Sequence, residues 1–246
     1  MRNTREAEVL GRLDHVTDPE LDEPVTELGF VTAVEIEGGT VQIDFRLPTY
    51  WCASNFAWMM ADDMRREVGI LPWVTRVIPR LGEHMYADKI NDGVAAGMSF
   101  HEAMGDEASG NLDELRQTFL VKAFQRRQEA LLRYLPDIDV VDLTLNELAA
   151  LPLDMAGCRL RARYVERRPL AGPGTLAFVD ATGQKLTHDG YREYLRGLRR
   201  IGTNAEFNGA LCGALLTARF GDDKPDLTGE PTLLDFARMG PSRPHR

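Results

Sequence analysis

Residues 47–56 read LPTYWCASNF and join two segments of different periodicity. Before them, apolar residues occupy every second position from 41 to 47, and this period of two predicts a half-buried strand. After them, apolar residues recur at intervals of three and four over residues 53–68, which predicts a helix packed along one face. Cys52 is therefore expected at or beside a helix N-terminus.

A cysteine in that position has a specific chemistry. Unpaired backbone N–H groups and the positive end of the helix dipole favour a thiolate over a thiol. A thiolate binds a soft metal or attacks an electrophile. The alternative for Cys52 is a buried structural thiol that fills the strand–helix junction, and the residues alone leave both interpretations open.

The composition of the whole chain narrows the class of protein. Its 246 residues allow one large domain or two small ones. A net charge of −9 argues against nucleic acid as the main partner. Cys52, Cys158 and Cys212 are too few and too scattered for a disulfide framework, and a reducing cytoplasm fits them better. We find neither a secretory signal nor an apolar run of roughly 20 residues, so we expect a cytoplasmic protein with no membrane partner.

The hydropathy pattern predicts an α+β fold. Residues 1–82 are expected to form a compact module of helix, hairpin, helix and strand, with the hairpin turning at Gly38 and Gly39. Residues 83–110 contain four glycines that interrupt any long helix, and we interpret them as an irregular linker or lid. Residues 111–225 are expected to form a mainly helical domain, and residues 226–246 a flexible tail.

Within the helical domain the pattern predicts helices at 111–135, 145–151, 188–200 and 204–219. Weak alternation over residues 158–168 predicts an exposed strand, and a second hairpin is expected at residues 175–179 and 184–186. Two segments are rich in arginine, and each is either a solvated face or an electrostatic docking surface for an acidic client. Their arginines are Arg159, Arg161, Arg163, Arg167 and Arg168, and then Arg192, Arg196, Arg199 and Arg200.

Three short motifs occur in one order in the first module. They are Asp-Pro-Glu-Leu at residues 18–21, Leu-Gly at residues 28–29, and Thr49 three positions before Cys52. In this order they resemble the metal–sulfur cluster assembly domain family, which includes SufT-like and PaaD-like proteins. The resemblance covers about residues 4–82. In that family a helix, a hairpin, a helix and a strand follow one another, and the reactive cysteine opens the second helix.

The chain departs from the family pattern beside the cysteine. The family commonly has proline directly after it, where this chain has Ala53. Tyr50 and Trp51 are bulkier than the small residues expected before it. These departures leave the backbone plan intact and concern the ligand or client of the family rather than its fold.

The resemblance implies a factor that assembles or delivers an iron or iron–sulfur centre. By position, Cys52 would be the metal or sulfur ligand, with Asp18, Glu20 and Thr49 lining the same pocket. One thiolate and two carboxylates do not complete a four-thiolate cluster site, which suits transient holding and handing over. A homodimer would bring two Cys52 thiolates together. For Asp18 and Glu20, turn and cap chemistry around Pro19 is the alternative to ligation.

A module of this family followed by a helical extension of about this length resembles the accessory proteins encoded beside bacterial soluble diiron monooxygenases, such as propane monooxygenases. This second resemblance implies a role in the maturation of a diiron hydroxylase as the client. One thiolate and two carboxylates suit a carrier more than a catalyst, so we expect that the chain is not an enzyme. The alternative function is a metal-free interaction scaffold or folding chaperone for such a monooxygenase. His84 and His101 lie near acidic residues but lack the two-histidine spacing of a helical metal site, so we expect solvated polar side chains there.

Overall fold

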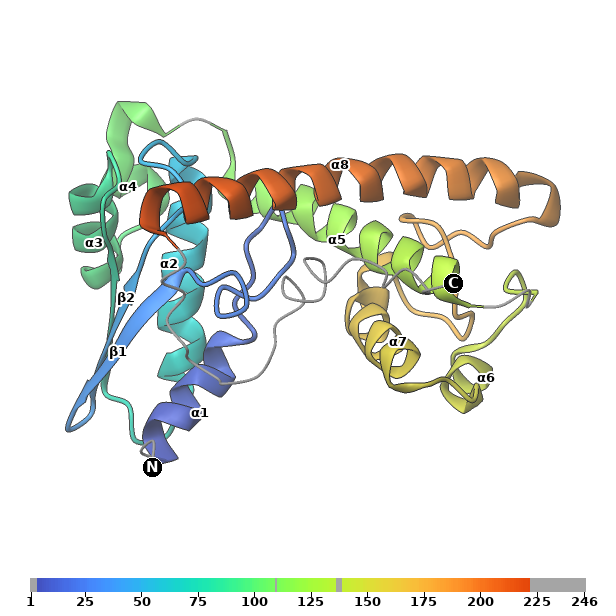
Figure 1. Ribbon diagram of the computed structural model, residues 1–246, viewed down its shortest axis with the longest axis horizontal. Coiled ribbons are helices and arrows are strands. Elements are labelled where there is room, and N and C mark those ends of the chain that lie inside the picture. Colours follow the sequence, from blue (N-terminus) through green and yellow to red (C-terminus); the bar gives the residue numbers. More distant parts are fainter. Residues whose placement is uncertain (1–3, 109, 136–138, 222–246) are drawn as a thin grey trace, which may run out of the picture. The chain divides into compact units, whose positions relative to one another are not determined.

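A computed structural model describes residues 4–108, 110–135 and 139–221. Its three-stranded sheet near the N-terminus and its mainly helical remainder confirm the predicted α+β class (Figure 1). The chain divides into two compact units. Unit 1 comprises Met1–Asp18, Asp22–Ser109 and Leu211–Arg246, and unit 2 comprises Pro19–Leu21 and Gly110–Ala210. The flexible tail predicted at 226–246 lies outside the described residues.

Unit 1 contains the predicted sequence of helix, hairpin, helix and strand, followed by two further helices. Its elements are α1 (Thr4–Leu13), β1 (Val31–Glu37), β2 (Thr40–Phe45), α2 (Ser54–Gly69), β3 (Arg76–Leu81), α3 (Ala87–Ala95), α4 (Phe100–Met104) and the 3-10 turn Gly105–Glu107.

The sheet has the order β1-β2-β3, with β2 in the centre. Strands β1 and β2 are antiparallel and turn at Gly38, whose φ of +61° suits glycine. Strands β2 and β3 are parallel and are joined through α2, which packs against β3. Every second residue of β2 from Val41 to Phe45 is buried, as the period of two predicts. The parallel register ends at the pair Phe45 and Leu81, so strands β2 and β3 end at the same edge of the sheet.

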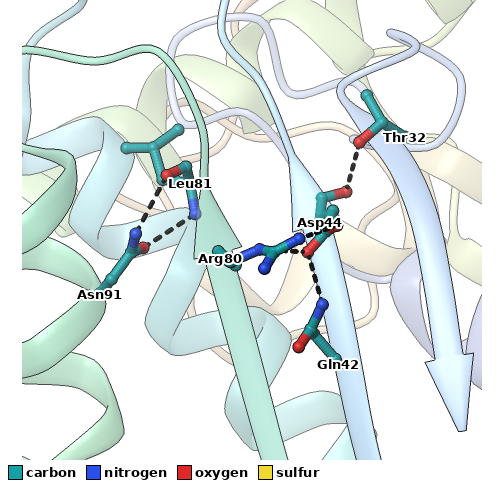
Figure 2. Close-up of polar contacts among 6 residues, drawn as sticks. All are labelled: Thr32, Gln42, Asp44, Arg80, Leu81 and Asn91. Carbon is teal, nitrogen blue, oxygen red and sulfur yellow. Dashed lines mark hydrogen bonds and ion pairs between the residues drawn. The ribbon is translucent and has the colours of Figure 1, made fainter.

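Polar side chains on the sheet join its strands (Figure 2). The carboxylate of Asp44 in β2 accepts two bonds from Arg80 in β3, at 2.9 and 2.7 Å. Thr32 in β1 donates to the backbone oxygen of Asp44 at 3.1 Å. Asn91 lies in helix α3 (Ala87–Ala95), and its side chain accepts from the N–H of Leu81 in β3 at 2.8 Å and donates to the Leu81 carbonyl at 3.0 Å. These bonds fix the position at which β3 ends and the next loop begins.

The prediction of an irregular linker at residues 83–110 is wrong, because α3 and α4 occupy most of that segment. Gly93 lies inside α3, where a Cβ would come within 2.8 Å of the Trp58 ring, so this glycine serves close packing rather than helix termination. Gly97 and Gly105 follow helices and have positive φ, which is the ordinary use of glycine at a helix end.

Unit 2 is built around buried aromatic residues on packed helices. Its elements are α5 (Leu112–Tyr134), α6 (Leu145–Ala150), α7 (Met155–Arg167), the 3-10 turn Arg168–Ala171, and α8 (His188–Phe220), whose residues from Leu211 onward belong to unit 1. Tyr164 of α7 stacks on Phe178 with ring centroids 5.2 Å apart. Gln128 of α5 is fully buried and donates to the backbone oxygen of Val179 at 2.8 Å.

Three local predictions in unit 2 are wrong. Residues 158–168 belong to α7 and not to a strand, because Asp154 caps a helix whose buried positions Gly157 and Tyr164 are seven residues apart. The hairpin is reduced to one bridge, Val179 with Lys185, and residues 175–177 instead bond residues 143–145. The two helices predicted at 188–200 and 204–219 are one helix, α8, which is continuous through Gly202. A Cβ at Gly202 would lie 3.2 Å from the Glu129 carboxylate.

The arginines of α7 and of the 3-10 turn after it do not form one solvated face. Arg161 donates to the carbonyls of Leu148, Ala149 and Leu151 at the end of α6, at 2.8–3.1 Å. Arg168 is buried and donates to backbone oxygens around Leu176. At these two positions the positive charge satisfies helix and loop carbonyls, as expected for cations near carbonyl-rich ends.

Across the described ranges, no helix combines the length and apolar character needed to cross a bilayer.

Candidate functional site

Cys52 lies in the loop between β2 and α2, two residues before the helix begins at Ser54. Its side chain is half-buried and therefore neither sealed in the core nor fully exposed. Ala53 is the N-cap residue, and its methyl side chain offers no acceptor to the first-turn N–H groups. The prediction that Cys52 lies beside a helix N-terminus is confirmed.

Thr49 lies against the thiol, with 3.1 Å between its Oγ1 and the Cys52 Sγ. A hydroxyl can accept from a thiol and can donate to a thiolate, so this contact persists in both protonation states. The structure thus brings together the two residues that sequence reasoning assigned to cofactor binding.

Asp18 and Glu20 lie in different surroundings. Asp18 is buried, and its backbone closes a turn through bonds to Glu23 at 3.0 Å and Asp22 at 2.8 Å. Glu20 is exposed and belongs to unit 2, where its Oε1 accepts from Asn208 at 2.9 Å. In the part of the chain that the structure describes, no three His, Cys, Asp or Glu side chains are grouped so that they could hold a metal ion. Metal ligation by Asp18, Glu20 and Cys52 stays a prediction.

The loop after β3 holds the Cys52 loop in place. His84 is only 5% exposed, and its Nε2 lies 2.8 Å from the Cys52 carbonyl oxygen. The backbone N–H of Tyr86 donates to Nδ1 at 3.2 Å, so Nε2 carries the proton and donates to Cys52. The N–H of Met85 donates to the Tyr50 carbonyl at 2.9 Å. Two bonds therefore fasten the residues on either side of Trp51.

The electrostatic environment favours the neutral imidazole. Burial lowers the pKa of His84 below its ordinary value, and the positive charge of Arg219 lowers it further, against the opposing effect of the bond to Cys52. Arg219 also donates to the carbonyls of Leu47 and Glu83, at 3.4 and 2.8 Å, and so contacts both loops. In the neutral His84 ring, Nδ1 can accept from the Tyr86 N–H while Nε2–H donates to the Cys52 carbonyl.

Sequence reasoning missed this role of His84 and expected a solvated side chain. No local sequence pattern marks this role, because it arises only when β2 and β3 pair in parallel and place their carboxyl ends at one edge of the sheet. That edge is where the loops after Phe45 and Leu81 meet. His101, in contrast, is exposed as expected, and its neighbour Glu102 forms a capping box with Ser99.

Cys158 and Cys212 are also half-buried. The Cys158 Sγ lies 3.5 Å from the Leu153 carbonyl oxygen and 3.6 Å from a nitrogen of Arg161. Both cysteines belong to helices, α7 and α8, rather than to a loop at a helix N-terminus.

Residues 6–78 match the model of a family described as iron-sulfur cluster assembly protein. This segment is an iron–sulfur cluster assembly domain. The match extends from α1 into β3, and it includes Thr49 and Cys52 but ends before His84. It confirms the family resemblance of the first module and supports a general role in cluster assembly. A comparison with curated proteins found no match to the chain.

Proposed function

We propose that the chain is a non-catalytic assembly factor that holds iron or an iron–sulfur centre through Cys52 and delivers it to a client metalloprotein. The observation that carries the proposal is the place of this cysteine in the assembly domain. Its thiol is half-buried and contacts Thr49, and its backbone is fastened by His84. A soft thiolate is a suitable ligand for iron in a cluster.

Holding rather than catalysis is supported by the number of ligands. Clusters are held by several thiolates, usually four, and Cys52 supplies one. The remaining ligands would come from the client, from a small thiol or from a second copy of the chain. A cargo with incomplete coordination leaves readily when a better ligand set approaches, which is what delivery requires. We propose a reducing cytoplasm as the place of action, because three scattered cysteines are too few for the disulfide framework of a secreted protein.

For the client we propose the diiron hydroxylase of a soluble monooxygenase, with unit 2 as the part that recognises it. The support is the resemblance of the overall architecture, an assembly module followed by a helical extension, to monooxygenase accessory proteins. Unit 2 also has exposed arginines on α8 that can attract an acidic client surface, namely Arg192, Arg196, Arg199 and Arg200.

The test compares thiol variants of the full chain. The protein is purified without oxygen and incubated with ferrous iron and sulfide, and bound iron and acid-labile sulfide are measured. Cys52→Ala should lose most of the bound iron and sulfide. Cys158→Ala is the matched control, because its thiol is also free and half-buried, and it should load like the natural chain. Equal loading of both variants would remove Cys52 from the mechanism.

The alternative function is a metal-free scaffold or folding chaperone for the same monooxygenase, and the exposed arginines of α8 favour it. Under this alternative, Cys52→Ala matures the apo-hydroxylase normally, while reversing the charges of Arg196 and Arg199 stops maturation. Arg161 is unsuitable for this test because it bonds three carbonyls at the end of α6 and its loss would perturb unit 2 itself.

A further inference from the structure

Large apolar side chains are exposed beside Cys52. Tyr50 is 51% exposed and Trp51 72% exposed, and both precede the cysteine directly. Met85, 48% exposed, comes from the facing loop, and its N–H bonds the Tyr50 carbonyl at 2.9 Å. These three residues form one patch, which we call the Trp51 patch. Trp51 and Tyr50 are also the residues that replace the small ones expected before the cysteine.

The Trp51 patch lies on a constrained backbone. The bonds from His84 to Cys52 and from Met85 to Tyr50 hold the residues on both sides of Trp51. A side chain presented by an ordered loop loses less conformational entropy when it is buried by a partner. Tryptophan, tyrosine and methionine are enriched at protein interfaces, and tryptophan and tyrosine are frequent hot spots. The composition and the constraint both indicate a binding surface.

The size of the patch argues against a stable dimer of this chain. A whole aromatic side chain buries roughly 150–250 Å², so three partly exposed side chains offer on the order of 300–400 Å². A stable interface buries about 800 Å² on each partner. The Trp51 patch is therefore the anchor of a small, transient contact, as a delivery step requires.

The charge of the chain gives a second argument against self-association. Residues 1–109 contain 20 Asp and Glu but only nine Lys and Arg. Two copies that approached through this region would repel each other, whereas a partner with a basic surface would be attracted.

We propose that the Trp51 patch docks a client metalloprotein that has an apolar pocket with a basic rim beside its own metal ligands. This inference rests on the proposed function, because it places the client next to the Cys52 cargo. Trp51 fills the pocket, and Tyr50 and Met85 exclude water around it. The thiol, one residue from the anchor, then faces the ligands that receive the metal centre.

The first stage of the test is photo-crosslinking with the full chain. The photoreactive residue p-benzoylphenylalanine is placed at position 51 and, as the control, at position 70. Ile70 is 61% exposed and lies at the other end of α2. The protein crosslinked at position 51 is identified, purified in its apo form and titrated with the full chain. We expect a metalloprotein that is captured at position 51 and not at position 70.

The second stage measures affinity. Trp51→Ala should weaken binding of the identified client on the order of 30-fold, as for an interface hot spot, and Trp51→Phe should weaken it less. Ile70→Ala should leave it unchanged, and binding of the natural chain should weaken as salt rises. Circular dichroism and melting curves verify that each variant is folded. No capture at position 51, capture of only a second copy of this chain, or equal losses in Trp51→Ala and Ile70→Ala would overturn the proposal.

The docking test and the loading test can fail independently of each other. Trp51→Ala should load iron and sulfide like the natural chain while transferring them poorly. Cys52→Ala should bind the client normally while carrying no cargo. Normal client binding by Trp51→Ala would reject docking by the Trp51 patch and leave the loading result standing. Normal loading by Cys52→Ala would reject cargo holding by the thiol, and the client titration would still report on the patch.

Discussion

Replacing His84 by alanine should loosen the Cys52 loop and leave unit 2 unaffected. The imidazole donates to the Cys52 carbonyl at 2.8 Å and accepts from the Tyr86 N–H at 3.2 Å. Alanine removes both bonds and leaves space where a ring with 5% exposure was packed. His84→Gln is the matched variant, because a glutamine side chain has an amide N–H₂ that can replace the Nε2 donor.

The magnitude follows from the bonds that are lost. Leaving a buried polar group unsatisfied costs about 1–3 kcal/mol. The Cys52 carbonyl loses its imidazole donor, so we take roughly 2 kcal/mol as the loss in free energy of opening the loop. Since about 1.4 kcal/mol corresponds to a factor of ten, the opened population should rise on the order of 30-fold.

Hydrogen exchange measured by mass spectrometry reports this opening directly. The Met85 N–H, protected by the Tyr50 carbonyl, should exchange faster in His84→Ala, as should peptides that cover residues 47–57. Peptides from α5 in unit 2 provide the internal reference. His84→Gln should recover much of the protection.

Unchanged exchange at Met85 in His84→Ala would refute the role of the imidazole as a clamp. An equal increase in His84→Ala and His84→Gln, or an increase throughout α5, would refute it as well. The first result would show that the loop is held by other contacts, and the second that the substitution acts by general destabilisation.

Three further outcomes are expected, and tryptophan fluorescence suits the first two because all three tryptophans lie in unit 1. The pKa of the His84 imidazole is lowered in the folded protein, so its stabilising contribution is complete above the ordinary pKa of 6.5 and is lost as the pH falls below that value. The urea midpoint should therefore fall on acidification more in the natural chain than in His84→Gln. Asn91→Leu should cost roughly 2 kcal/mol in urea unfolding, because both backbone groups of Leu81 lose a partner, and an unchanged midpoint would contradict this. Tyr164→Phe removes the hydroxyl that donates to the Ala177 carbonyl, but Arg168 still donates to that carbonyl at 3.2 Å, so unit 2 should be destabilised by only about 1 kcal/mol. Hydrogen exchange in α7 checks this, and loss of protection throughout unit 2 would contradict it.

The local errors in the two units have two physical causes. A short segment such as residues 158–168 satisfies a period of two and a period near 3.6 almost equally, and the buried Tyr164 distinguishes them only after it is packed. A glycine such as Gly93 or Gly202 ends a helix in one context and permits close approach in another. Which role applies depends on the neighbouring side chain, which is Trp58 for Gly93 and Glu129 for Gly202.

The sequence alone determined the local order of the assembly domain and the position of its cysteine. The change from a period of two to a period of 3.6 across residues 47–53 is enough to place Cys52 just before α2, because these signals act over a few residues. Tertiary structure decided what surrounds the thiol. His84 and Met85 reach this loop only because β2 and β3 pair in parallel through α2, and a contact across more than 30 residues leaves no local pattern to read.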